Sequence, residues 1–163
     1  MPFVYLPPKQ VRRCKECAER RQAANSDPNR PNHNADTDPH RNMMWELRGA
    51  FGELAVAHYL GLSWSGEHEA GQPDVGGTVE VRTTQPTYRL AIVDKDLTTH
   101  SPSTPYVSAT WDGRTDTVTI GLRGWHLLGD IAEMMTPLIK NGHRFYTVET
   151  KDLRPMADLK ALS

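Results

Sequence analysis

The stretch PDVGGTVEVRTT at residues 73–84 decides the fold class. Its last seven residues, 78–84, alternate apolar and polar side chains and are rich in β-branched residues, which is typical of a β-strand. Gly76 and Gly77 allow the chain to reverse in a tight turn just before this strand. The stretch therefore predicts a turn that leads into a strand of a β-sheet.

The residues before this strand predict a helix over 42–60, because apolar side chains recur there every three or four positions. Asn42 can cap the start of this helix and Gly61 can end it. Further elements are expected as strands at 88–93, 105–111, 117–122 and 145–149, and as helices at 10–24, at 125–135 and in the tail. Asp112-Gly113 is expected to form the turn between two of these strands. This order predicts an α/β or α+β fold, with a sheet flanked by helices.

Composition sets further bounds on the protein. The chain has 163 residues, a net charge of −1 and 37% hydrophobic residues, which suits one domain with a real core. Its longest apolar runs, at 54–57 and 90–93, are too short to cross a bilayer, so no membrane partner is expected. The first ten residues lack the pattern of a secretory signal, and two cysteines make no disulfide framework. We therefore expect a cytoplasmic, intracellular protein.

Charge is unevenly spread along the chain. Residues 1–30 hold seven basic and three acidic residues, whereas the rest holds 12 basic and 17 acidic residues. A cationic segment on an acidic body is common in proteins that touch phosphate backbones, and the alternative is a solvated helix of mixed charge. With the turn-forming run at 25–40, this predicts a basic N-terminal helical arm and polar loop over 1–41 and a core domain over 42–163. The residues expected to contact DNA are Arg12, Arg13, Lys15, Arg20 and Arg21.

Three carboxylates each have an ordinary explanation when taken alone. Glu53 can face solvent, Asp74 can be a turn residue, and Glu80 can form a surface ion pair with Arg82 on the same strand face. The Gly-Gly turn, however, would bring Asp74 beside the strand that carries Glu80, and a packed helix could add Glu53. Carboxylates gathered at one point repel one another unless a hard divalent cation lies among them. This reasoning predicts a magnesium or manganese site.

Pro73-Asp74, a five-residue gap and then Glu80-Val81-Arg82 resemble the motif of the PD-(D/E)XK nuclease superfamily. Members commonly place a glutamate on the preceding helix, as in Gly52-Glu53 here, and many have a glutamine three residues after the motif lysine, as in Gln85. The resemblance covers roughly residues 43–159 and is closest to small phage and bacterial members.

This resemblance implies a restriction-endonuclease-like fold, with a central mixed sheet flanked by helices. It implies DNA hydrolysis in which Mg²⁺ or Mn²⁺ activates a water molecule. The implied metal ligands are Glu53, Asp74, Glu80 and the carbonyl of Val81. The implied catalytic residues are Asp74, Glu80, Arg82, Gln85 and Glu53. Because many relatives pair to cut two strands, a homodimer is also expected.

Arg82 departs from the motif, which has lysine at this position. Arginine grips phosphate oxygens well but does not accept a proton. Either a metal-bound hydroxide is sufficient, or Lys95 reaches in from another element, or the site is slow or dead. In the last case the chain is a non-catalytic DNA-binding or assembly protein that keeps a nuclease-like fold.

A second motif pairs Cys14 and Cys17 with two downstream histidines, His33 and His40. A Cys-x-x-Cys pair can supply half of a structural zinc site, and histidines can complete it. Six residues separate the two histidines, more than the usual three to five. The alternative is two reduced thiols with two loop histidines. A third hypothesis is a small zinc-stabilised protein whose acidic residues are surface charges only.

Overall fold

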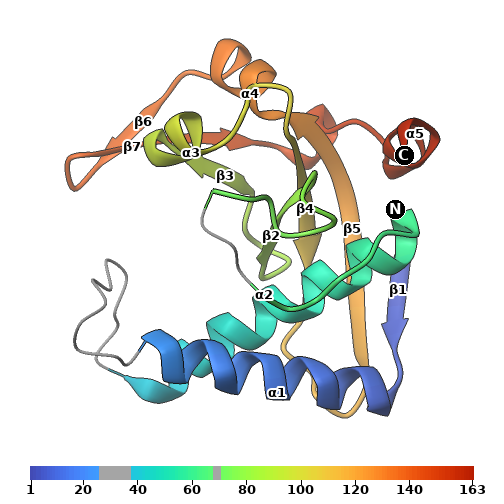
Figure 1. Ribbon diagram of the computed structural model, residues 1–163. Helices are drawn as coiled ribbons and strands as arrows, with labels where there is room; N and C mark the ends of the chain where they lie inside the picture. Colours follow the sequence, from blue (N-terminus) through green and yellow to red (C-terminus); the bar gives the residue numbers. More distant parts are fainter. Residues whose placement is uncertain (26–37, 68–70) are drawn as a thin grey trace.

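The computed structural model of the protein describes residues 1–25, 38–67 and 71–163. Within these residues four strands form a mixed sheet, called here the main sheet, in the order β1–β5–β4–β2 (Figure 1). Its strands are β1 (Phe3–Leu6), β5 (Val118–Leu127), β4 (Pro105–Thr110) and β2 (Glu80–Thr84). Strands β2 and β4 run parallel, and the other neighbours run antiparallel. The α/β class and the mixed sheet are therefore confirmed.

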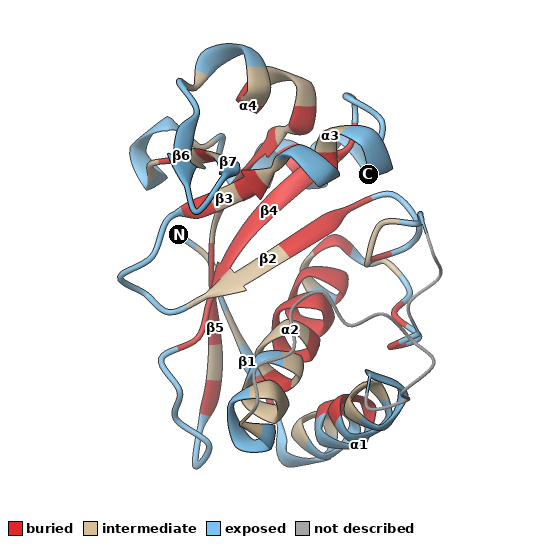
Figure 2. Cartoon of the chain, turned by 90° about the vertical axis from the view of Figure 1, so that its left-hand side faces the viewer, coloured by how far each residue is buried: buried red, intermediate tan, exposed pale blue. Residues whose placement is uncertain are grey.

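Two helices lie on one face of the main sheet. Helix α2 (Pro39–Leu60) packs on the strands, and α1 (Pro8–Asn25) packs on α2. Every residue from 50 to 57 of α2 is buried, because the helix lies between the sheet and α1 (Figure 2). Gly52 permits the close approach to β2, since a Cβ atom there would lie 1.7 Å from the Thr83 hydroxyl oxygen. Helix α2 therefore packs directly on β2 at this position.

The ends of α2 follow from capping chemistry. Asp38 is the N-cap, its side chain accepts a hydrogen bond from the amide of His40, and Pro39 begins the helix. The prediction that Asn42 caps the start is therefore wrong, because the Asp-Pro pair starts the helix earlier. The predicted end at Gly61 is confirmed, and this residue has the left-handed φ of 72° that favours glycine.

The N-terminal segment contributes to the same core as α2. Strand β1, which the sequence pattern did not predict, pairs with β5, and Leu6 at its end is buried. Helix α1 buries Cys14, Cys17 and Ala18 against α2. Residues before and after the expected boundary at 41 thus share one core.

A smaller antiparallel sheet packs on part of the other face of the main sheet, around Tyr106, and two of its strands confirm those predicted at 88–93 and 145–149. Its order is β3–β7–β6, with β3 (Leu90–Val93), β7 (His143–Val148) and β6 (Leu138–Lys140). Two short helices accompany it, α3 (Asp94–Thr99) and α4 (Leu128–Met134). Tyr106 of β4 belongs to the second core cluster formed here. The chain ends in a 3₁₀ turn, η1 (Thr150–Asp152), and in α5 (Met156–Leu162).

The helix predicted over 125–135 is wrong in its first three residues. These complete β5, and α4 begins only at Leu128. The reason lies far along the chain, because Trp125 pairs its main chain with that of Arg154 and buries its ring. The expected Asp112-Gly113 turn lies in the loop between β4 and β5. None of the described helices is both long and apolar enough to cross a bilayer.

Candidate functional site

The hairpin before β2 brings Asp74 to the strand that carries Glu80. Gly76 and Gly77 have φ values of 59° and 68°, and Val75 and Val79 pair across the turn. An oxygen of the Asp74 carboxylate accepts a hydrogen bond of 3.1 Å from the amide of Val81. The backbone N–H of Asp74 in turn favours the ionised form of Glu80. The two predicted residues therefore lie together at the start of β2.

Arg82 lies between two carboxylates. Its Nη1 atom is 2.5 Å from Oε1 of Glu80, and its Nη2 atom is 2.6 Å from Oδ1 of Asp96. Its guanidinium also stacks over the ring of Tyr106 at 5.3 Å. Because Thr83 faces α2 and side chains alternate along a strand, Arg82 projects from the opposite face of β2. We call Glu80, Arg82 and Asp96 the Arg82 cluster.

Asp96 is a member of this cluster that sequence reasoning missed. It is buried on α3, and its second oxygen accepts a 2.9 Å hydrogen bond from the amide of Val93, which caps the helix. Lys95, which the sequence offered as a replacement for the motif lysine, is exposed on the same short helix. The usable signal was an acidic residue at the third position after a strand end, where it caps a new helix.

Burial raises the pKa of Glu80, although Arg82 opposes this shift. Burial also lowers the pKa of Arg82, but the carboxylates of Glu80 and Asp96 more than offset this and leave that pKa raised. Asp74 adds to the same field, so three carboxylates act on a single guanidinium. The site therefore has more negatively charged than positively charged side chains.

Buried polar atoms near the cluster have no hydrogen-bond partner in the structure. His100 comes within 3.6 Å of Glu80 through Nε2, its side chain is 8% exposed, and its Nδ1 atom is unpartnered. Ser108 pairs in register with Arg82, and its buried hydroxyl is also unpartnered. Burial lowers the pKa of His100 and raises the pKa of Tyr106. Such atoms are costly in a folded protein unless something else binds to them.

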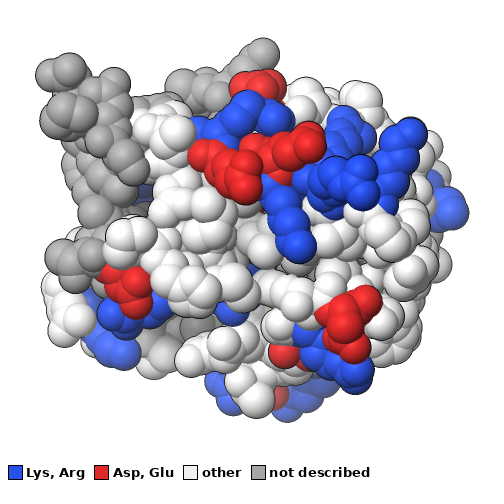
Figure 3. Space-filling view, turned by 90° about the horizontal axis from the view of Figure 1, so that it is seen from below, with Lys and Arg blue, Asp and Glu red and all other residues white. Residues whose placement is uncertain are grey.

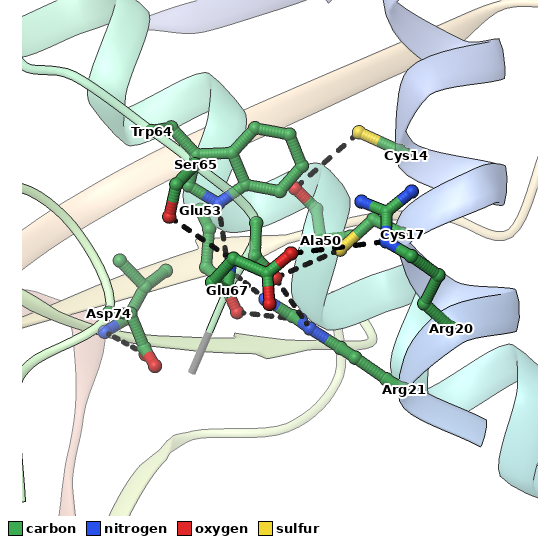
Figure 4. A network of polar contacts seen from close by, with 12 residues as sticks. Cys14, Cys17, Arg20, Arg21, Ala50, Glu53, Trp64, Ser65, Glu67 and Asp74 are labelled. Carbon is green, nitrogen blue, oxygen red and sulfur yellow. Dashed lines mark hydrogen bonds and ion pairs between the residues drawn. The ribbon is translucent and has the colours of Figure 1, made fainter. Parts of the chain in front are cut away.

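Glu53 lies in a different cluster, on the α1 side of the sheet (Figure 4). Arg21 reaches its two oxygens at 3.0 and 2.7 Å, and the indole N–H of Trp64 donates to one of them at 2.8 Å. The side chains of Arg21 and Glu53 are only 9% and 4% exposed. We call Arg21, Glu53 and Trp64 the Arg21 cluster. Glu53, expected at the metal site, and Arg21, expected at DNA, are thus bound to each other.

Two other predicted site residues, Gln85 and Val81, lie after β2 and on it. Gln85 is exposed in the turn after β2, where its carbonyl accepts a hydrogen bond from the amide of Tyr88. The side chain of Val81 is buried, and its main-chain amide donates a hydrogen bond to Asp74.

The two cysteines are buried between α1 and its neighbours. The Cys14 thiol donates to the carbonyl of Ala50, and the Cys17 thiol to that of Gly66. Burial raises the pKa of Cys14 to about 12, and it also raises the pKa of Cys17. His40 is exposed at the start of α2, and His33 lies outside the described residues. The described residues contain no group of three or more His, Cys, Asp or Glu that could hold a metal ion.

The exposed side of α1 carries mixed charge rather than a continuous basic patch (Figure 3). Its exposed basic residues are Lys9, Arg12, Arg13, Lys15 and Arg20, and its exposed acidic residues are Glu16 and Glu19. Arg13 stacks on Trp64 at 4.9 Å and donates to its carbonyl at 2.7 Å. Four of the five residues expected to contact DNA therefore face solvent, and Arg21 is the exception.

Comparisons of the chain with protein-family models, with curated proteins and with solved structures found no match.

Proposed function

We propose that this protein is a metal-dependent nuclease that hydrolyses DNA phosphodiester bonds at Asp74 and Glu80. One observation carries the proposal. The two acidic residues of the nuclease-like motif lie together at the start of β2, beside a half-buried arginine that neutralises only part of the local negative charge. Folding alone does not favour such an excess of buried carboxylates.

The donor types at this place suit a hard divalent cation, with Asp74 and Glu80 as two acidic ligands. Carboxylate oxygens and a main-chain carbonyl, such as that of Val81, are the ligands that Mg²⁺ and Mn²⁺ prefer. The Val81 amide fixes the orientation of Asp74, so one ligand is held in place before any ion arrives. Bound here, the ion would supply an activated water and screen charge on the phosphate.

The chain's own residues have defined roles in this proposal. Arg82 is one-third exposed and carries a planar fork of donors, so its guanidinium can bind the oxygens of the scissile phosphate. Asp96 binds the Nη2 atom of this guanidinium, while Glu80 binds Nη1, and the two contacts together fix its orientation. Glu53 acts as a structural residue, because it holds α1 against α2 through Arg21.

The test is cleavage of double-stranded, single-stranded and branched DNA in the presence of Mg²⁺ or Mn²⁺. We expect wild type to cut at least one of these substrates and Glu80→Gln to cut none. Glu133→Gln, which changes an exposed glutamate on α4, is the matched control and should cut like wild type. A wild-type protein that cleaves none of the substrates with either ion would contradict the proposal.

A second function is favoured by the arginine itself. Arg82 already contacts both Glu80 and Asp96, where a cation would otherwise balance them. This contact supports a DNA-binding or assembly protein without catalysis, with Arg12, Lys15 and Arg20 on DNA phosphates. In that case DNA binding should survive Glu80→Gln and removal of divalent ions, without turnover. Binding should also weaken with rising salt and with charge reversal at Arg12 and Lys15.

A further inference from the structure

A cavity of about 760 Å³ lies beside the Arg82 cluster. Its walls come from the hairpin before β2, from the loop between α3 and β4, and from α5. Pro73, which directly precedes Asp74, lines it, and so does His100, whose Nε2 atom is 3.6 Å from Glu80. Neither carboxylate of the proposed metal site lines the cavity, but residues next to each of them do, and the volume is in the range of small-molecule sites.

The cavity combines an apolar wall with a polar rim. Its apolar part includes Leu62, Val79, Leu127, Leu159 and Leu162. Its rim includes the hydroxyl-bearing residues Thr99, Ser101 and Ser103 and a guanidinium, that of Arg154. Arg154 is about half exposed, stacks on the Trp125 ring at 5.2 Å and lies 3.5 Å from Asp130. An occupant with an apolar planar part and an anionic part would match these walls.

His100 joins this cavity to the Arg82 cluster. Its side chain is more than nine-tenths buried and lines the cavity, yet its Nδ1 atom has no hydrogen-bond partner in the structure. Because the Nε2 atom of the same ring lies 3.6 Å from Glu80, an occupant that contacts His100 would lie one side chain away from that carboxylate.

We propose that this cavity binds one unstacked nucleotide, with its base against the apolar wall and its phosphate toward Arg154. The inference rests on the proposed nuclease function and adds a substrate class. Taking a base out of a stack costs least at a frayed end or in a single strand. The protein therefore acts on single-stranded or terminal nucleotides in preference to the interior of a duplex.

The test measures binding of 2′-deoxyadenosine 5′-monophosphate to the full chain by calorimetry, without divalent ions. Wild type should bind saturably. Leu162→Trp, which fills the cavity from an exposed position on α5, and Arg154→Gln, which removes the guanidinium, should each weaken binding about tenfold. The matched controls, Ala161→Trp on the same helix and Arg89→Gln at another exposed ion pair, should bind like wild type. The nucleoside without phosphate should respond to Leu162→Trp but not to Arg154→Gln.

The absence of saturable binding, or equal binding by both variants and wild type, would overturn the inference. Its failure is distinguishable from failure of the nuclease proposal. Nucleotide binding by a wild type that cleaves no DNA removes the nuclease and leaves the cavity as a nucleotide site. Cleavage by a wild type that binds no nucleotide, with equal rates on single strands and blunt duplex, removes the cavity assignment alone.

Discussion

The Arg21 cluster and the Arg82 cluster both join an arginine to carboxylate, but the first is buried and the second partly exposed, and they differ in charge balance. Arg21 meets one carboxylate, that of Glu53, through two hydrogen bonds, and Trp64 adds a third. Arg82 divides its guanidinium between Glu80 and Asp96, with Asp74 in electrostatic reach. Unpartnered buried polar atoms lie near Arg82, on the side chains of His100 and Ser108.

This difference separates a structural role from the role that we propose for the Arg82 cluster. The one-to-one pair of Arg21 and Glu53 joins α1 to α2 across 32 positions of sequence, and it is fully neutralised. Around Arg82, Asp96 caps α3 and Asp74 holds the Val81 amide, but one guanidinium does not neutralise the three carboxylates that act on it. Charge arrangements that fold stability would not select are typical of functional sites.

The largest effect is expected from Glu53→Gln. This change leaves Arg21 buried without its counter-charge, which should lower the free energy of unfolding by about 3–5 kcal/mol. Urea denaturation measures the loss, and Glu19→Gln on the exposed side of α1 is the control. Equal stability of the two variants would show that the Arg21 cluster is not structural.

The sequence predicted the Arg82 cluster better than the Arg21 cluster. Alternation along 78–84 placed Glu80 and Arg82 on one face, and the Gly-Gly turn brought Asp74 beside them, because both signals are local. The partner of Glu53 could not be predicted, since no pattern shows which cation on α1 will pack against α2. Asp96 was missed for the same reason, because its contact with Arg82 depends on how β3 and α3 fold over the main sheet.

Strands β1 and β6 were also beyond local pattern, whereas β3 and β7 of the second sheet were predicted as strands at 88–93 and 145–149. Strand β1 has four residues and is stabilised by its pairing with β5, more than 110 positions later. Strand β6 has three exposed residues and lies at the edge of its sheet. Short edge strands lack a strong periodic signal, because their pairing partner rather than their own sequence stabilises them.

Gly52→Ala tests whether α2 packs on β2 as closely as the structure indicates. The new methyl group would meet Thr83 at 1.7 Å, so helix and strand must separate, at a cost of about 1–3 kcal/mol in unfolding free energy. Gly49→Ala is the matched control on the same helix, because its nearest neighbours are 3.8 Å away. It should stabilise by about 0.5–1 kcal/mol, as alanine does in a helix. Equal thermal midpoints for the two variants would contradict the close packing.

Arg82→Gln tests whether a divalent cation can take the place of the guanidinium. Two buried carboxylates would lose their shared cation, and stability should fall by about 1–2 kcal/mol, less than at Glu53 because Arg82 is partly exposed. Millimolar Mg²⁺ should restore part of this loss, whereas NaCl at equal ionic strength should not. Arg89→Gln, at an exposed pair, should show no such rescue. If Mg²⁺ stabilises the two variants equally, the carboxylates do not bind the ion.

The smallest effect is a change in how stability depends on pH. Because burial raises the pKa of Glu80 above its ordinary value of 4.5, the folded protein holds this proton more tightly than the unfolded chain does. The Glu80 contribution to the free energy of unfolding therefore falls as pH rises from 4.5 through the raised pKa, and it is constant above that. Glu80→Gln cannot titrate, so its stability relative to wild type should rise over this interval and then level off. Urea denaturation between about pH 4 and pH 8 measures the difference, with Glu133→Gln as control. Parallel profiles for Glu80→Gln and wild type would mean that Arg82 fully compensates the burial of Glu80, and the two clusters would then be alike in balance.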